Sequence, residues 1–226
     1  MIKKRKISII ETTLVPLQSL RELFFEILPE VELVSFVDDS LLKEVINAGG
    51  PTPDVIRRYC TYAVEAEIIG SDLIFNQCSS VGEVVDIAQK MVSIPILKTD
   101  LPMAKKAVEI GDKIGVVATL KSTLAPTTCL IQKTADEKGK KIKIIPKLCE
   151  GAFDLISKGD KEGHNKIIIK TIQELSAKVD VIALAQGSMA VLIPELGDMK
   201  IPVLSSPRSG VLWAKEVLGE LPGIHY

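Results

Sequence analysis

SDLIFNQCSS at residues 71–80 and VDVIALAQGS at residues 179–188 are two versions of one segment, and they decide how the chain folds. In both versions an apolar run follows an Asp and leads into polar residues, so that Cys78 of the first matches Gln186 of the second. The offset between these two residues is 108 (186 minus 78). Similarity of this kind at a large offset predicts that the chain contains a repeat.

Two more pairs of segments support the repeat. KISIIETT at residues 6–13 matches KIGVVATL at residues 113–120, with an offset of 107 (113 minus 6). SIPILKT at residues 93–99 matches KIPVLSS at residues 200–206, again with an offset of 107 (200 minus 93). Three pairs in the same order and at nearly one spacing indicate internal duplication.

Each repeated segment has the pattern of a strand in a parallel sheet. A short continuous run of Ile, Val and Leu, bounded by polar residues or by Gly and Pro, is typical of a strand buried on both faces. Further strands are expected at residues 32–37 and 141–147. Apolar residues at three- and four-residue spacing predict helices between the strands. These include residues 54–69, 101–110, 122–138, 161–178 and 207–218.

The chain is therefore predicted to be an α/β protein with two pseudo-symmetric halves, each a small doubly wound parallel sheet. The first half comprises residues 1–98 and the second residues 99–206, and the C-terminal segment 207–226 is expected to pack back onto the first half. AGGPTP at residues 48–53 occurs in the first half alone and is a candidate flap. Because ligands bind beyond the carboxyl ends of parallel strands, one small-molecule site is expected in a cleft between the halves.

The composition excludes several classes of partner. Twenty-eight Lys plus Arg against twenty-nine Asp plus Glu give a net charge of −1, which favours neither nucleic acid nor anionic lipid. No apolar run approaches the roughly 18 residues of a membrane-spanning helix, and the run after the basic N-terminus is too short for a signal peptide. A cytoplasmic protein is expected, and a homo-oligomer is left open. The glycine motifs that bind nucleotides are absent, and no cofactor is expected.

The four cysteines form neither a metal-binding nor a disulfide pattern, because they lie far apart without a CxxC pair and the chain has only two histidines. Cys60, Cys129 and Cys149 are expected to be small buried hydrophobic residues. Cys78 differs, since it follows a predicted strand and precedes a helix expected to begin near Val81. The helix N-terminus is expected to lower the thiol pKa and to favour a thiolate that acts as base or nucleophile. The alternative is a small residue that fits a tight turn.

The other residues at the predicted carboxyl ends of the strands are rich in hydroxyls and nearly free of charge. Hydroxyl and backbone N–H groups at helix starts suit a carboxylate, a phosphate or a similar anion, although a single Ser or Thr can also serve only as a helix cap. The candidate substrate-binding residues are Thr12, Ser79, Ser80, Thr119, Ser122, Thr123, Gly187 and Ser188.

NQCSS after a buried strand, GVVATLKST in the second half and the 107-residue repeat resemble the aspartate/glutamate racemase superfamily over nearly the whole chain. The resemblance implies two α/β halves with the site between them. It also implies that two cysteines, one from each half, exchange a proton without a cofactor at a carbon beside a carboxylate. Cys78 then matches the first cysteine, Ser79 and Ser80 match the carboxylate-binding residues after it, and residues 119–123 match a hydroxyl-rich turn.

The chain departs from this pattern at the second cysteine, which is replaced by QGS at residues 186–188. Glutamine carries no transferable proton near neutral pH, so a two-thiol racemase does not follow. Cys78 and Gln186 are still expected to face one another across the cleft, with Cys78 as the catalytic thiol and Gln186 as a ligand for a substrate oxygen. A small amino acid or dicarboxylate is the expected substrate, and racemase, isomerase and decarboxylating lyase remain possible. Cys149 or Glu150 is a weaker candidate for a second base, and a non-catalytic carboxylate-binding protein is the alternative from another class.

Overall fold

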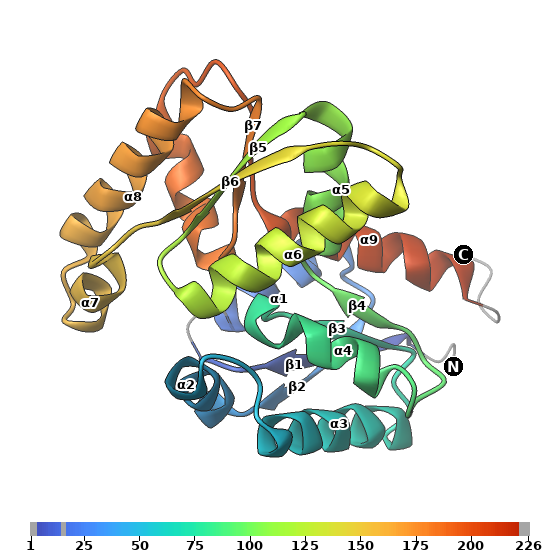
Figure 1. Ribbon diagram of the computed structural model, residues 1–226. Helices are drawn as coiled ribbons and strands as arrows, with labels where there is room; N and C mark the ends of the chain where they lie inside the picture. Colours follow the sequence, from blue (N-terminus) through green and yellow to red (C-terminus); the bar gives the residue numbers. More distant parts are fainter. Residues whose placement is uncertain (1–3, 15–16, 222–226) are drawn as a thin grey trace. The chain divides into compact units, whose positions relative to one another are not determined.

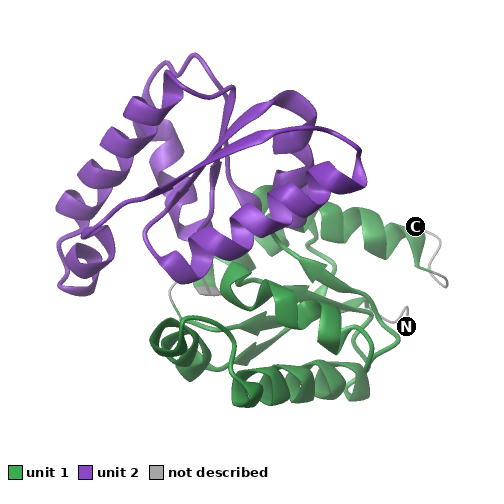
Figure 2. Cartoon of the chain, in the orientation of Figure 1, with its two compact units in different colours: residues 1–99, 207–226 green, residues 100–206 purple. Residues whose placement is uncertain are grey.

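The structure, a computed structural model, describes residues 4–14 and 17–221. It consists of two compact units, which Figure 2 shows in different colours. Unit 1 contains residues 1–99 and 207–226, and unit 2 contains residues 100–206. Each unit has one four-stranded parallel sheet with helices packed against it, so the predicted α/β fold class is confirmed.

The sheet of unit 1 is parallel throughout and has the strand order β2-β1-β3-β4 (Figure 1). Its register pairs Ile10 of β1 with Asn76 of β3, and Asn76 in turn with Lys98 of β4. The segments that follow these three strands therefore start at the same edge of the sheet. The strands are β1 (Lys6–Glu11), β2 (Glu32–Val37), β3 (Leu73–Asn76) and β4 (Ile96–Lys98).

Helices cover both faces of this sheet. Neighbouring strand residues point to opposite sides, and apolar side chains on both sides need to be buried. Ile9 packs in a cluster with α1 (Leu17–Ile27) and α9 (Ser206–Glu220). Ile10 packs in the cluster of the other face, and both side chains are fully buried. That second face is covered by α2 (Asp39–Ala48), α3 (Pro53–Ile68) and α4 (Gly82–Ala88). Burial on both faces explains why the strands are continuous apolar runs rather than alternating ones.

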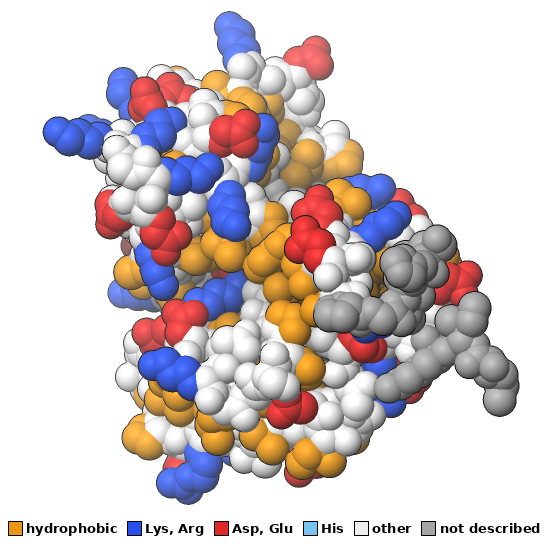
Figure 3. All heavy atoms as spheres, turned by 90° about the vertical axis from the view of Figure 1, so that its right-hand side faces the viewer, with side chains coloured by type: hydrophobic (Ala, Val, Ile, Leu, Met, Phe, Trp, Pro, Cys, Tyr) orange, Lys and Arg blue, Asp and Glu red, His pale blue; other side chains and the backbone are white. Residues whose placement is uncertain are grey.

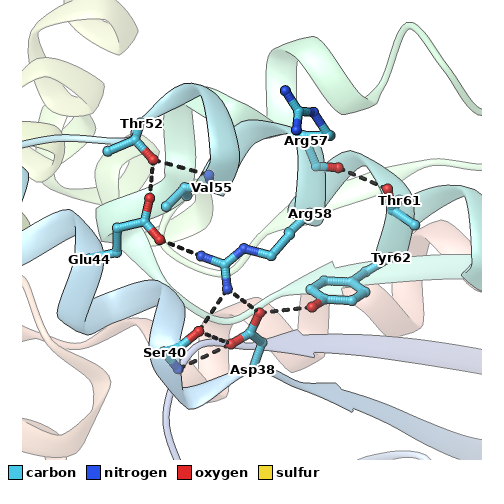
Figure 4. Close-up of polar contacts among 9 residues, drawn as sticks. All are labelled: Asp38, Ser40, Glu44, Thr52, Val55, Arg57, Arg58, Thr61 and Tyr62. Carbon is cyan, nitrogen blue, oxygen red and sulfur yellow. Dashed lines mark hydrogen bonds and ion pairs between the residues drawn. The ribbon is translucent and has the colours of Figure 1, made fainter.

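A network of hydrogen bonds and ion pairs links α2 to the start of α3 (Figure 4). Arg58 Nη1 donates to Asp38 Oδ2 at 2.8 Å, and Arg58 Nη2 pairs with Glu44. The Thr52 hydroxyl donates to Glu44 as well, and its oxygen accepts the backbone N–H of Val55 at 3.2 Å, which caps α3. The connection is thus anchored where α3 begins, and its role as a flap stays a prediction.

Helix α9 approaches the end of β4 so closely at Gly210 that a side chain has no room. A Cβ atom added there would lie 2.7 Å from Thr99 Oγ1 and 2.8 Å from the Thr99 carbonyl oxygen. Gly219 of the same helix faces open space. The glycine at position 210 is therefore required by the packing of α9 against the sheet.

The sheet of unit 2 repeats the strand order of unit 1 as β6-β5-β7-β8, again parallel throughout. The strands are β5 (Lys113–Ala118), β6 (Lys143–Leu148), β7 (Val181–Leu184) and β8 (Val203–Leu204). The α-helices are α5 (Leu101–Ile110), α6 (Lys121–Glu137), α7 (Ala152–Ser157) and α8 (Lys161–Ser176). For each of the five helices predicted by residue range, the first and last residues lie within two residues of those of an observed helix.

One expected element of unit 2 has a different conformation. The repeat predicts an α-helix after β7, but Gly187–Leu196 forms a 3-10 helix, η2. Pro194 lies inside this segment and has no backbone N–H, so it cannot continue the hydrogen-bond ladder of an α-helix. The short helix α7 was not predicted.

The surface carries charges of both signs. Figure 3 shows basic and acidic side chains interspersed on one face, in keeping with the net charge of −1. Within residues 4–14 and 17–221, no helix is both long and apolar enough to cross a membrane.

Candidate active site

Cys78 lies two residues beyond the end of β3, in extended backbone at φ −109° and ψ 118°. A short 3-10 helix, η1 (Ser79–Val81), follows it and leads directly into α4. The Cys78 sulfur lies beside the hydroxyl and backbone amide of Ser80, the backbone amide of Val81 and the hydroxyl of Thr12, which has no hydrogen-bond partner of ordinary geometry among the described residues. Thr12 comes from the end of β1, so the parallel register brings it beside the thiol. Two of the predicted substrate-binding residues, Thr12 and Ser80, are thus gathered around Cys78.

The thiol of Cys78 is not a stabilised thiolate. Burial raises its pKa above the ordinary 9.0, and the polar groups of Thr12, Ser80 and Val81 beside the sulfur offset this only in part. The prediction that a helix N-terminus lowers this pKa is therefore wrong. The physical reason is that burial disfavours the charged thiolate, and the donors at the start of the three-residue η1 do not outweigh this cost, while α4 starts only four residues after Cys78. Near neutral pH the side chain is a neutral thiol that carries a proton.

A chain of two hydrogen bonds, which starts at a buried tyrosine, holds the backbone of Cys78. Tyr59 Oη, on α3, donates to Asn76 Oδ1 at 3.0 Å, and Asn76 Nδ2 donates to the Cys78 carbonyl oxygen at 3.1 Å. Tyr59 and Asn76 are fully buried. Sequence reasoning missed both residues. An Asn that ends a strand two positions before a candidate cysteine was the available signal, whereas nothing in the sequence marked Tyr59.

Glu11, the last residue of β1, is a buried acid without a hydrogen-bond partner of ordinary geometry in the described part of the chain. Burial raises its pKa to about 7, and the Ser35 hydroxyl and the Arg21 guanidinium pull it down by smaller amounts. Arg21 lies on α1 and donates to Ser35 Oγ at 3.2 Å. Glu11 therefore belongs to the α1 side of the sheet, whereas Cys78 packs against the cluster of α2, α3 and α4. No role was predicted for Glu11 from the sequence.

In unit 2, Gln186 occupies the position that matches Cys78 in the repeat. It follows β7 in extended backbone at φ −121° and ψ 127°, directly before η2. Its side-chain Oε1 accepts two hydrogen bonds from Thr119, one from the backbone N–H at 2.7 Å and one from Oγ1 at 3.0 Å. The structure thus brings together two more of the predicted site residues, at the ends of β5 and β7.

The remaining predicted residues start helices in the two units. Ser79 is buried in η1. Ser122 and Thr123 lie in the first turn of α6, which has no side-chain cap, and Ser122 Oγ is buried without a hydrogen-bond partner among the described residues. Gly187 and Ser188 open η2, where Ser188 is exposed. The expectation that Cys78 and Gln186 face one another across a cleft stays a prediction.

The other cysteines divide into buried and exposed ones. Cys60 and Cys149 are buried, as predicted, and Cys149 packs in a core cluster of unit 2 with its sulfur near Thr171. Cys149 is therefore part of the core rather than a second base. Cys129 is exposed, so the prediction that it is buried is wrong, because it lies on the solvent side of α6. Among residues 4–14 and 17–221 no three His, Cys, Asp or Glu side chains are grouped to hold a metal ion.

Solved structures of racemases resemble this fold. Glutamate racemase from Francisella tularensis subsp. tularensis SCHU S4, in complex with D-glutamate, has a TM-score of 0.75 at 15% identity, covering 96% of this chain and 82% of that one. Aspartate racemase from Picrophilus torridus has a TM-score of 0.69 at 14% identity, covering 95% and 94%. Allantoin racemase from Klebsiella pneumoniae has a TM-score of 0.67 at 14% identity, covering 96% and 88%. At these identities the similarity establishes the fold alone.

Sequence comparison identifies the family. No curated protein matches the chain significantly. The family model described as Asp/Glu/Hydantoin racemase matches residues 10–213, which include the strand ends of both units. Because this match spans most of the sequence, the chain belongs to the Asp/Glu/hydantoin racemase family.

Proposed function

We propose that this chain is a cofactor-independent enzyme that transfers a proton at the carbon beside a carboxylate of a small amino acid or dicarboxylate. Cys78 is the residue that carries the proton. The observation that supports this most is the set of donor groups beside its sulfur: the hydroxyl and backbone amide of Ser80, the backbone amide of Val81 and the hydroxyl of Thr12, which has no other hydrogen-bond partner among the described residues. Such donors stabilise the thiolate that forms when the proton leaves.

The raised pKa of Cys78 favours one direction of this chemistry. A neutral thiol is ready to donate, so the S–H bond breaks as a C–H bond forms on a substrate carbanion or enolate. The electron pair of the S–H bond stays on sulfur as the thiolate, which the donor groups of Ser80, Val81 and Thr12 then stabilise. In the reverse direction the thiolate removes the same proton.

Gln186 limits the stereochemistry of the proposed reaction. A racemase that uses two thiols needs a second proton carrier on the opposite side of the carbon, and a carboxamide cannot act as one. Cys149, the other thiol considered for this role, is packed in the core of unit 2. We therefore propose that proton transfer takes place on one side only, as in an isomerase or a decarboxylating lyase of this family.

Deuterium exchange tests the proposal directly. Small dicarboxylates and amino acids are incubated with the protein in deuterated water, and NMR follows exchange at the carbon beside the carboxylate. We expect exchange with at least one compound, and we expect it to disappear in Cys78→Ser, because a serine hydroxyl is too weak an acid and base near neutral pH. Cys129→Ser, which changes an exposed thiol, is the matched control and retains exchange.

A second candidate function is binding of a small carboxylate without turnover. The raised pKa of Cys78 and the glutamine at position 186 are the observations that favour it. Its signature is saturable binding of a carboxylate with no exchange in wild type at any pH. That result refutes the enzyme proposal and leaves the binding function.

A further inference from the structure

The side-chain amide of Gln186 is held in one orientation. Its Oε1 accepts both the backbone N–H and the hydroxyl of Thr119, at 2.7 and 3.0 Å. A backbone N–H can only donate, so the group beside it must be the oxygen of the carboxamide and not its NH2. The amide orientation thus follows from the chemistry of Thr119.

The fixed oxygen leaves the nitrogen of Gln186 directed away from Thr119. No hydrogen bond from Gln186 Nε2 to an acceptor is present among residues 4–14 and 17–221, and the residue is partly exposed. Its two N–H groups are therefore available to solvent or to a ligand. Gln186 could present its oxygen to a ligand only if the side-chain amide turned over. The Thr119 N–H would then lose its acceptor, which is costly in a buried position.

We propose that Gln186 Nε2 binds an anionic oxygen of the substrate and that Thr119 is the positioning residue that selects this orientation. The inference rests on the proposed function, since the oxygen is that of the carboxylate or enolate beside the reacting carbon. Thr119, predicted as a direct ligand, acts through Gln186 instead, because its own two donors are already used.

The segment that follows Thr119 carries further donors that suit an oxygen with negative charge. Helix α6 begins two residues after Thr119, and its first turn has no side-chain cap. Ser122, in that turn, has a buried hydroxyl without a hydrogen-bond partner among the described residues. Donors that are already in place when charge develops on oxygen lower the barrier to forming an enolate, and loss of one such donor typically slows a reaction by about 100-fold or more.

Binding of malonate, measured by isothermal titration calorimetry, tests the role of Gln186. In Gln186→Glu one carboxylate oxygen can still accept from Thr119 while the other replaces the donor with a negative charge. We expect the dissociation constant for malonate to rise by at least about tenfold. Gln173→Glu adds the same charge on an exposed position of α8 and should leave binding unchanged. Binding by Gln186→Glu as tight as in wild type, or no binding of malonate by wild type, overturns the inference.

Two variants at position 119 test the positioning role. Thr119→Val removes the hydroxyl donor and should weaken malonate binding about threefold or more, and Thr119→Ser should restore it. Thr134→Val, which removes a buried hydroxyl within α6, is the control for effects on folding alone. The side-chain amide signals of Gln186, identified by their loss in Gln186→Glu, should shift on addition of malonate in a 15N NMR spectrum. Unshifted signals, or equal binding by Thr119→Val and wild type, refute the positioning role.

These outcomes separate the inference from the proposed function. Cys78→Ser should lose proton exchange and keep malonate binding. Malonate binding that depends on Gln186 without any exchange in wild type supports the inference and refutes the enzyme. Exchange that depends on Cys78 but is unchanged in Gln186→Glu refutes the inference and leaves the enzyme in place.

Discussion

Asn76 Nδ2 donates a hydrogen bond to the backbone carbonyl oxygen of Cys78 at 3.1 Å, so a buried strand residue holds the backbone of the candidate catalytic cysteine. The amide oxygen of the same Asn accepts the hydroxyl of Tyr59 at 3.0 Å. Both ends of the Asn76 carboxamide are therefore occupied. The position of Cys78 depends on a contact with α3 as well as on its own strand.

Tyr59→Phe removes the hydroxyl of this chain and leaves Asn76 Oδ1 buried without a donor. We expect the free energy of unfolding to fall by about 1–3 kcal/mol, because an unsatisfied buried acceptor loses its hydration without compensation. Urea unfolding measures this change. Tyr62→Phe on the same helix is the control, since Tyr62 is only partly buried and its partner Asp38 keeps bonds to Ser40 and Arg58. Equal losses in the two variants would contradict the special role of Tyr59.

The raised pKa of Cys78 predicts how its reactivity changes with pH. Removal of a substrate proton needs the thiolate, whose population rises with pH until the pKa above 9.0 is passed. We therefore expect the rate of deuterium exchange to increase throughout the range from pH 7 to pH 9 without a plateau. Alkylation by iodoacetamide, followed by mass spectrometry, should likewise be slower at Cys78 than at the exposed Cys129 near pH 7. A plateau of the exchange rate below pH 8 would mean that Cys78 is already a thiolate there, which would contradict its raised pKa.

The raised pKa of Glu11 predicts that stability falls as pH rises, whereas an acid in an ion pair makes stability rise with pH. Folding raises its pKa from 4.5 to about 7, so the folded chain holds this proton more tightly than the unfolded chain does. The free energy of unfolding therefore falls as pH rises from 4.5 to about 7, by up to about 3 kcal/mol. Glu11→Gln should remove the fall and be more stable than wild type above pH 7.

Urea unfolding of wild type and Glu11→Gln at pH 5 and pH 8 measures this difference. Glu30→Gln, at an exposed position, is the control and should leave the pH profile unchanged. Parallel profiles for wild type and Glu11→Gln would mean that Glu11 is not protonated in the folded chain near neutral pH.

Gly210→Ala and Gly219→Ala make a matched pair in α9. The new methyl group at position 210 would collide with the side chain and the backbone of Thr99, and we expect a loss of about 1–3 kcal/mol in the free energy of unfolding. At position 219 the space is open, and alanine should stabilise the helix by up to about 1 kcal/mol. Thermal unfolding compares the two variants. A stable Gly210→Ala would mean that α9 is not packed against β4.

Gln186→Cys tests whether the missing thiol sets the stereochemistry. Wild type should exchange one enantiomer of a chiral substrate, because only Cys78 carries a proton. The variant should exchange both enantiomers, with a lower total rate since the amide donor is lost. Chiral chromatography of the product, together with NMR in deuterated water, distinguishes these outcomes. Equal exchange of both enantiomers by wild type, persisting in Cys78→Ser, would place the chemistry elsewhere.

The sequence by itself determined the strands and the positions at their ends. The segments at residues 6–13, 71–80, 113–120 and 179–188 each contain a short, mostly apolar run because both faces of each sheet are covered, and polar residues follow the run. The end of each strand could therefore be predicted without knowing which strand pairs with it. Cys78 and Gln186 were found for the same reason, since each is the second residue after a buried strand.

Only the tertiary structure decided the chemistry of these positions. The orientation of the Gln186 amide depends on Thr119, which is 67 residues away in the sequence, and the backbone of Cys78 depends on Asn76 and, through it, on Tyr59 of α3. The pKa of a thiol or a carboxyl depends on how many neighbours exclude water from it. Local sequence does not encode that number, so burial raised the pKa of Cys78 where its neighbouring residues alone predicted a lower one.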